Sequence, residues 1–180
     1  MRIASAKGGM TRGFTLIEMV VVVIAISILA GFALDRLLPL IGRAERIAFL
    51  QVQAELQTAL LLEAADLITR GENAKLPDLA AGNPMRMLLK TPANYAGALR
   101  PADPADVAGD TWYYDERLGR LVYRVGRYTR FDPLDGPRGR VEFRVALVYR
   151  DGNGDGSFDP ASDRFEGLRL EPASPYRWPD

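Results

Sequence analysis

The sequence predicts an α+β fold in which one long N-terminal helix packs on a small antiparallel β-sheet. Three observations lead to this prediction. An apolar segment near the amino terminus is long enough for a membrane-spanning helix, an amphipathic pattern continues beyond it, and apolar and polar residues alternate in the second half of the chain as in strands. The 180 residues have room for about one domain.

The composition excludes several classes of function. The chain has no cysteine and no histidine, which removes disulfides, thiolate metal sites and the commonest general base. It also lacks a G-x-S-x-G motif and a phosphate-binding loop, so we expect no enzyme. Three basic residues, Arg2, Lys7 and Arg12, precede Gly13 without any acidic residue among them. The remainder has no basic stripe, so no nucleic-acid partner is expected.

The first apolar segment predicts a single membrane span. Residues 14–34, FTLIEMVVVVIAISILAGFAL, carry one charge, that of Glu18. As a helix rising about 1.5 Å per residue, this segment would match a hydrocarbon core of roughly 30 Å. The basic residues before it place the C-terminal part outside the cytoplasm. We assign residues 1–13 to a leader and residues 14–36 to the membrane helix.

Glu18 requires an explanation, because an acidic side chain within a membrane helix costs about 2.5–3.5 kcal/mol at mid-depth and less near an end. Two interpretations are open. Glu18 lies close enough to the interface to reach headgroups or water, or it pairs with a cation on a neighbouring subunit. A free amino terminus created at Phe14 would be such a cation, and cleavage there would keep the apolar segment, unlike the cleavage of a secretory signal.

Residues 13–18, GFTLIE, followed by a Val/Ile-rich run, resemble the prepilin cleavage and methylation signature of type IV pilins and pseudopilins. The resemblance covers the basic leader, the glycine, the phenylalanine, the glutamate and the apolar span. It implies cleavage after Gly13, N-methylation of Phe14 and an assembly role for Glu18, which would neutralise the amine of an adjacent subunit. These reactions would be done to this chain and not by it.

For the whole chain, the resemblance implies a pilin-like head and a single-pass subunit of the bacterial inner membrane, with the head in the periplasm. Its partners would be prepilin peptidase, other pilin or pseudopilin subunits in a homo- or heteropolymer, an inner-membrane assembly platform and the lipid bilayer. We expect a structural subunit of a type II secretion pseudopilus or a related type IV filament. The alternative is a major or minor type IV pilin in adhesion or DNA uptake, which is disfavoured for a major pilin by the absence of a cysteine pair.

Residues 37–70 continue the helical pattern as an amphipathic segment that we expect to pack on the sheet. Its apolar stripe follows steps of three and four, with Glu45 among the polar residues elsewhere around the helix. A kink is predicted at Pro39, near Gly42, and a stop at Arg70-Gly71. A coiled coil is a competing interpretation. The members of the stripe are Ile41, Ala44, Ala48, Val52, Leu56 and Ala59.

Residues 71–110 are rich in Pro, Gly, Asn and Asp, which indicates a long connecting loop with one short helix at residues 84–90. The head, residues 111–180, contains predicted strands at residues 111–115, 120–125 and 140–150. The third strand alternates apolar and charged residues as in a sheet with one covered face. The aromatic residues expected in the core or half-buried are Trp112, Tyr113, Tyr123 and Tyr149.

An acidic loop, DGNGDGSFDPASD, follows the third predicted strand. Its first half matches the D-x-[DN]-x-[DN]-G start of a calcium loop, in which oxygen ligands converge and a glycine permits the turn. The twelfth position is Ser162 instead of glutamate. Some pseudopilins carry calcium in such a loop, so the resemblance supports the same prediction. The alternative is an acidic turn without metal. The predicted calcium ligands are Asp151, Asn153, Asp155, Asp159 and Asp163.

Overall fold

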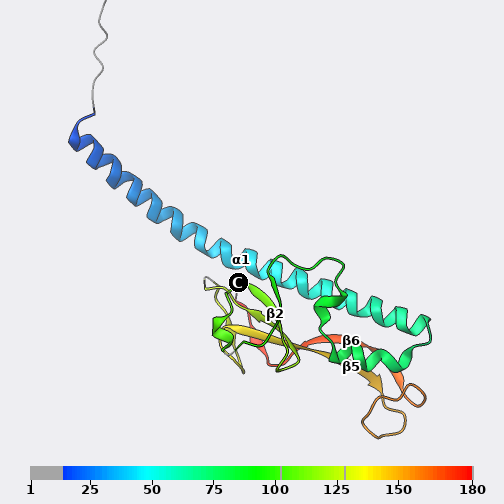
Figure 1. The fold of residues 1–180 in the computed structure, drawn as a ribbon. Coiled ribbons are helices and arrows are strands. Elements are labelled where there is room, and N and C mark those ends of the chain that lie inside the picture. The colour runs from blue at the N-terminus through cyan, green and yellow to red at the C-terminus, as the bar shows by residue number, and fades with distance from the viewer. Residues whose placement is uncertain (1–13, 102, 128, 180) are drawn as a thin grey trace, which may run out of the picture. The chain divides into compact units, whose positions relative to one another are not determined.

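Helix α1, Leu16–Thr69, is the longest element of the computed structural model (Figure 1). The structure describes residues 14–101, 103–127 and 129–179. Contacts within the chain divide it into two units that meet between Leu38 and Pro39, and each is described by itself. The predicted leader, with Arg2, Lys7, Arg12 and Gly13, lies outside the described residues.

The described part of the first unit is the beginning of α1. Its side chains are exposed throughout, and the helix is long and apolar enough to cross a membrane. Because so much exposed apolar surface is unfavourable in water, this segment requires lipid or other apolar helices around it. The helix continues through Pro39 without a break, and the kink predicted there stays a prediction.

The end of α1 lies where the sequence predicted it. Gly71 has a φ of 74°, and its N–H donates to the carbonyl of Ile68 at 3.0 Å. The N–H of Glu72 donates to the carbonyl of Leu67 at 2.9 Å. These two bonds form a Schellman motif, which satisfies carbonyls that the last turn leaves unpaired and favours glycine in the left-handed position.

The second unit contains the sheet on which α1 packs. Its strand order is β1-β2-β3-β5-β6, with β1 parallel to β2 and the other neighbours antiparallel. A two-stranded sheet pairs β4 with β7. The predicted α+β class is therefore confirmed. The strands are β1 (Tyr95–Leu99), β2 (Thr111–Asp115), β3 (Arg120–Arg124), β4 (Asp132–Pro133), β5 (Arg140–Arg150), β6 (Arg164–Pro172) and β7 (Tyr176–Arg177).

The predicted strands correspond to β2, β3 and β5, but the sequence analysis missed the other four strands. The connection before β2 also has more structure than a loop. It contains α2 (Leu76–Ala81) and β1, and the predicted short helix is a 3-10 helix, η2 (Pro84–Met87). The other 3-10 helices are η1 (Asn73–Lys75) and η3 (Pro104–Asp106).

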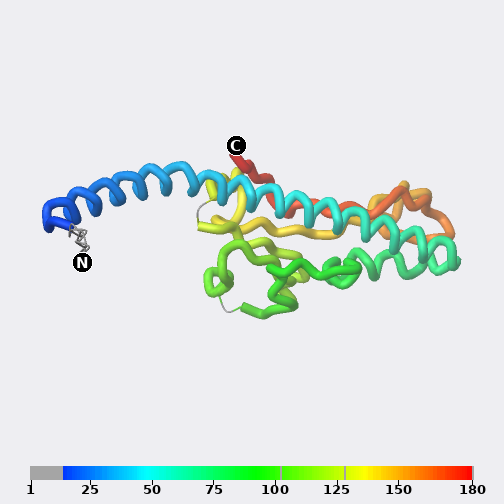
Figure 2. Tube along the Cα trace, turned by 90° about the horizontal axis from the view of Figure 1, so that it is seen from above, coloured from blue at the N-terminus to red at the C-terminus, as the bar shows by residue number. Residues whose placement is uncertain are grey.

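The second half of α1 runs alongside the strands (Figure 2), and aromatic side chains join it to the sheet. The ring of Phe49 stacks on that of Trp112, with ring centres 5.3 Å apart and planes 8° apart. It also contacts Tyr123 at 4.9 Å and Trp178 at 4.7 Å between ring centres. Such pairs add about 0.5–1.5 kcal/mol to the stabilisation from buried area. Trp112, Tyr113 and Tyr123 are buried and Tyr149 is half-buried, as predicted.

The face of α1 that packs on the sheet corrects the predicted stripe. Val52 and Leu56 are buried as expected, but Ile41, Ala44 and Ala48 are exposed and Ala59 is only half-buried. The prediction counted alanines as equal to larger apolar residues, whereas the large side chains Phe49 and Leu60 fill the space above the sheet. The buried positions are Glu45, Phe49, Val52, Leu56, Leu60, Ala64 and Leu67.

Candidate functional site

The helix after the predicted cleavage site begins with a capped turn. The N–H of Glu18 donates to Oγ1 of Thr15 at 3.3 Å, and the N–H of Met19 donates to the carbonyl of Thr15 at 3.2 Å. Thr15 is therefore the N-cap, and Glu18 stands at the third helical position, the spacing of a capping box. The sequence analysis missed this role of Thr15, although the T-x-x-E spacing is a local signal for it.

Glu18 and Phe14 both have exposed side chains. The carboxylate of Glu18 lies in the first turn of α1, where a negative charge interacts favourably with the helix dipole, by about 0.3–1 kcal/mol at an exposed position. Glu18 lies four positions after Phe14, so an amine at Phe14 would stand within about one turn of it. The predicted roles of Gly13, Phe14 and Glu18 stay predictions.

Glu45 is a buried charge on the packed face of α1, with 7% of its surface exposed. Its carboxylate accepts hydrogen bonds from the Tyr123 hydroxyl at 2.8 Å, the Gly126 N–H at 2.7 Å and the Thr129 hydroxyl. A Cβ added at Gly126 would lie 2.6 Å from Oε2 of Glu45, so a larger residue there would displace the carboxylate. These bonds make a buried carboxylate tolerable.

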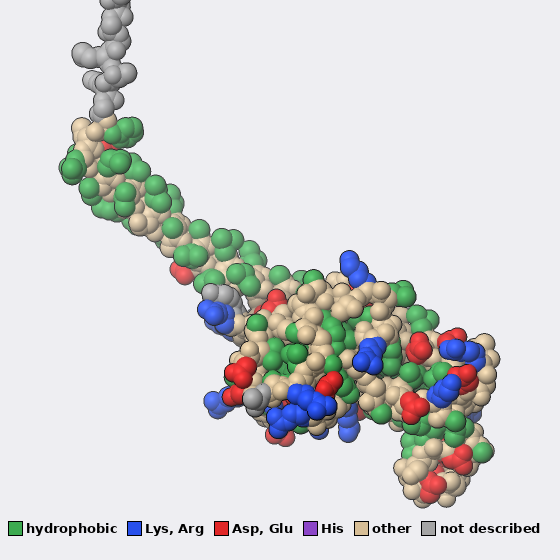
Figure 3. Space-filling view, viewed as in Figure 1, with side chains coloured by type: hydrophobic (Ala, Val, Ile, Leu, Met, Phe, Trp, Pro, Cys, Tyr) green, Lys and Arg blue, Asp and Glu red, His purple; other side chains and the backbone are tan. Residues whose placement is uncertain are grey.

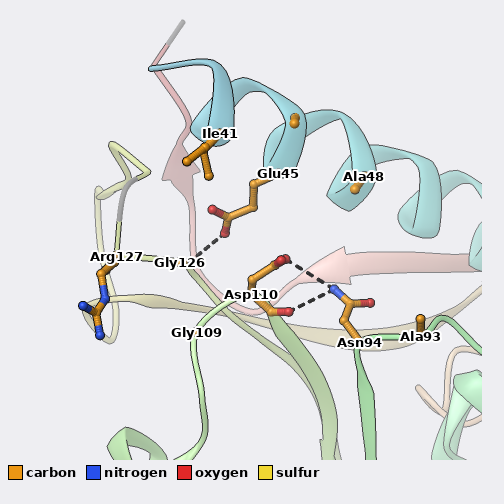
Figure 4. A pocket seen from close by; sticks show the side chains of 10 residues that line it. Ile41, Glu45, Ala48, Ala93, Asn94, Gly109, Asp110, Gly126 and Arg127 are labelled. Carbon is orange, nitrogen blue, oxygen red and sulfur yellow. Dashed lines mark hydrogen bonds between the residues drawn. The ribbon is translucent and has the colours of Figure 1, made fainter. Parts of the chain in front are cut away.

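A second carboxylate lies beside this network (Figure 4). Oδ1 of Asp110 is 2.7 Å from the Tyr123 hydroxyl, and Nδ2 of Asn94 donates to the carbonyl of Asp110 at 3.0 Å. Burial is the main cause that raises the pKa of Tyr123, and the hydrogen bonds to Asp110 and then to Glu45 raise it further. The phenol therefore stays protonated and can act as a donor.

Glu45, Asn94, Asp110 and Gly126 line an open pocket of about 770 Å³. Its walls are largely apolar and include Ile41, Ala44 and Ala48, three members of the predicted stripe that do not pack on the sheet. The Glu45 carboxylate at its edge is engaged by three donors. The network therefore positions the connections around β2 and β3 against α1. Sequence reasoning could not find it, because the donors are about 80 residues from Glu45.

The acidic loop joins β5 to β6, and its residues 151–157 are exposed. The carboxylate oxygens of Asp151 accept hydrogen bonds from the N–H groups of Gly154 at 2.6 Å and Gly156 at 2.9 Å. The hydrogen bonds from Gly156 and then Gly154 lower the pKa of Asp151, so this carboxylate stays ionised. Asp163 likewise accepts the N–H of Gly152 at 2.9 Å, which ties the end of the loop to its beginning.

The loop has oxygen ligands of the kind that calcium prefers. Asp151, Asn153 and Asp155 share a turn, where Nδ2 of Asn153 donates to Oδ2 of Asp155 at 2.9 Å. Asp159 accepts the N–H of Ala161 at 2.9 Å. Among the residues that the structure describes, no three acidic side chains are placed to hold one metal ion. The calcium site stays a prediction.

Comparison with known proteins identifies the amino-terminal segment. Residues 9–34 match the family model of the prokaryotic N-terminal methylation motif. The chain carries the prepilin signature of type IV pilins and pseudopilins. The match includes Gly13, Phe14, Thr15 and Glu18. No curated protein and no solved structure matches the chain.

The signature supports a type IV pilin-like protein that prepilin peptidase processes. The matched segment contains the first part of α1 up to Leu34, which is also the part of the helix that is long and apolar enough to cross a membrane. The motif points to a structural subunit and not to an enzyme. It does not include the head, whose Glu45 network and acidic loop lie beyond the matched residues.

Proposed function

We propose that this pilin-like protein is a structural subunit of a type II secretion pseudopilus or a related type IV filament. The observation that carries the proposal is the methylation motif at residues 9–34, which runs into a helix whose first part has no buried residue. The helix anchors the subunit in the inner membrane, with the head in the periplasm. After cleavage following Gly13, the same helix packs against other subunits.

Glu18 selects the register of that packing in this proposal. An amine at N-methylated Phe14 of one subunit pairs with Glu18 of the next, in surroundings where apolar helices exclude water. Poor screening there strengthens the attraction and makes an unpaired carboxylate costly. A subunit displaced along the filament axis would lose the pair, so one register is favoured over the others.

The intact mass of the full chain from host membranes, with amino-terminal fragmentation, tests the processing. We expect a chain that begins at N-methylated Phe14. A chain that begins at Met1 in cells with active prepilin peptidase would refute the proposal. Deleting the chromosomal copy is expected to abolish protein secretion, whereas a loss of adhesion or DNA uptake with secretion intact would identify a type IV pilin instead.

Glu18→Gln tests the assembly step with little change in size. We expect the variant to insert into membranes and to be processed, but to form few or no filaments, because the amide cannot neutralise the amine. Glu55→Gln is the matched control, since Glu55 is an exposed glutamate further along the same helix. Normal filaments from Glu18→Gln would contradict the proposed pairing.

The proposal includes a calcium ion that orders the acidic loop. Two features support it: the alternation of Asp151, Asn153 and Asp155 before Gly156, and four aspartates between residues 151 and 163 without any Lys or Arg. Like charges so close together repel one another, and a divalent cation would relieve this repulsion.

A further inference from the structure

The face of the head sheet that turns away from α1 carries a row of arginines. On β5, Val141 and Phe143 are buried in the core. Because side chains alternate along a strand, the even-numbered positions of β5 up to Ala146, before the irregularity at Val148, lie on the opposite face, with the β3 and β6 residues that pair beside them. We term this surface the arginine face, and it consists of Arg120, Arg124, Arg140, Arg144 and Arg169.

The arginines on this face outnumber the carboxylates that could neutralise their charge. Glu142, only 8% exposed, accepts from Arg120 and Arg140, each at 2.8 Å. One carboxylate thus pairs with two guanidinium groups, so these three side chains together carry a net charge of +1. Arg124 beside them donates to the carbonyl of Gly139 at 3.0 Å, which cancels no charge.

The same arrangement repeats nearer the acidic loop. Arg144 and Arg169 both contact Glu171 at 3.5 Å, and their side chains are 64% and 63% exposed. Asp115 is the other carboxylate on the face, and its Oδ1 accepts the N–H of Arg117 at 2.8 Å in the turn after β2. Five arginines therefore stand against three carboxylates, and the two most exposed arginines can take a further anionic partner.

The opposite charge is concentrated in the acidic loop. Residues 151–163 contain four aspartates and no Lys or Arg. Their hydrogen bonds from loop N–H groups hold the carboxylates in place without cancelling their charge. In Figure 1 this loop projects from the end of the β5–β6 hairpin, and in Figure 3 the projecting end shows Asp and Glu side chains without Lys or Arg on the side in view. A bound divalent cation would cancel only two of the four charges.

A subunit does not reach its own arginine face with this loop. Arg144 and Arg150 are six residues apart on β5, which is roughly 20 Å of extended strand, and the loop continues away from that end. We propose that the acidic loop of one subunit docks on Arg144 and Arg169 of a second copy of this chain. This inference rests on the proposed function, which brings copies together in a filament.

Such a contact joins two different surfaces of the same protein. Contacts of this kind are heterologous, and they generate an open helical assembly when the rotation between subunits does not close a ring. Each subunit would therefore donate its loop to one neighbour and receive the loop of another, which adds a salt-sensitive contact between heads to the packing of the helices.

Cysteine pairs test the contact in the full chain in host membranes, because the chain has no cysteine of its own. Ser157→Cys lies in the loop, and Ala146→Cys lies on the arginine face opposite Arg169. We expect oxidation of this double variant to give a ladder of covalent oligomers. Ser157→Cys with Thr58→Cys, on the exposed side of α1, is the control and is expected to give none. No ladder from the first pair, or equal ladders from both, would overturn the proposal.

Charge neutralisation gives a second, independent test. Arg144→Gln with Arg169→Gln, and separately Asp155→Asn with Asp159→Asn, are each expected to weaken the association about two- to thirtyfold, as for the loss of two exposed ion pairs. The variant that combines all four substitutions is expected to associate no more weakly than either double variant, because both double variants remove the same contact. Arg70→Gln with Lys75→Gln, two exposed cations beyond the end of α1, is the control. Fully multiplicative losses would show two separate contacts and refute the docking.

The outcomes separate this inference from the proposed function. If Phe14 is N-methylated and filaments depend on Glu18, while the loop and arginine variants assemble like the wild type, only the docking is wrong. If the cysteine pair forms its ladder in a chain that still begins at Met1, the docking holds and the proposed processing is wrong.

Discussion

Replacing Glu45 by alanine tests whether the buried carboxylate holds the head together. In the folded protein, Glu45 accepts from the Tyr123 hydroxyl, the Gly126 N–H and the Thr129 hydroxyl. After the replacement, Tyr123 keeps Asp110 as an acceptor at 2.7 Å. The N–H of Gly126 loses its acceptor, and the half-buried Thr129 hydroxyl must turn to water.

The expected loss of stability follows from these contacts. A donor left without a partner costs about 1–3 kcal/mol. The one methylene group removed from a buried side chain contributes about 0.8 kcal/mol. Because the pocket beside Glu45 is open, water can compensate part of both losses. We therefore expect Glu45→Ala to lower the free energy of unfolding by about 2–4 kcal/mol, with Glu45→Gln in between because its amide oxygen still accepts from Gly126.

The assay is urea unfolding of the full chain in detergent. Unfolding is monitored by the fluorescence of Trp112 and Trp178, which both belong to the aromatic core. Glu55→Ala removes an exposed glutamate from the same helix and is expected to change the free energy of unfolding by less than about 0.5 kcal/mol. A Glu45→Ala variant as stable as the Glu55→Ala control would refute the structural role of the network.

Phe49→Ala removes the ring that joins α1 to the sheet and should lower the free energy of unfolding by about 3–5 kcal/mol, whereas Leu61→Ala on the exposed side of α1 should have little effect in the same urea titration. Calcium should raise the melting temperature of the wild type relative to chelator but not that of Asp151→Asn, and equal melting temperatures for the wild type would remove the calcium proposal. The pKa of Tyr123 is raised in the folded state. The stability that its protonated hydroxyl contributes is therefore present below about pH 10, the pKa of tyrosine in the unfolded chain, and is lost progressively as the pH rises above that pKa. Tyr123→Phe should reduce this alkaline loss in unfolding curves at pH 9 and pH 11, and an unchanged dependence would contradict the assignment.

The sequence by itself determined the features whose signals are local. The methylation motif, the apolar span, the strands at β2, β3 and β5 and the glycine stop after α1 all depend on residues within a few positions of one another. The N-cap at Thr15 belongs to the same class, since its T-x-x-E spacing was present in the sequence and was overlooked. Local conformational preference and hydrophobic periodicity suffice for such features.

Strands β1 and β6 depended on more than local pattern. β1 contains Gly97 at a φ of 95°, and β6 pairs with β5 across an irregularity between Val148 and Tyr149. Glycine and a shifted register both interrupt the alternation by which a strand is predicted. Pairing with an existing strand stabilises these segments, so they form only in the context of the sheet.

Tertiary structure alone decided which face of α1 is buried and why Glu45 belongs to it. A stripe through Ala44 and Ala48 and one through Glu45 and Phe49 lie one position apart, and the helical period permits both. The choice depends on what the sheet offers: aromatic rings around Phe49, and a hydroxyl and a backbone N–H around Glu45. Those partners come from residues 112–178, far along the chain, and a buried carboxylate is stable only where such donors meet it.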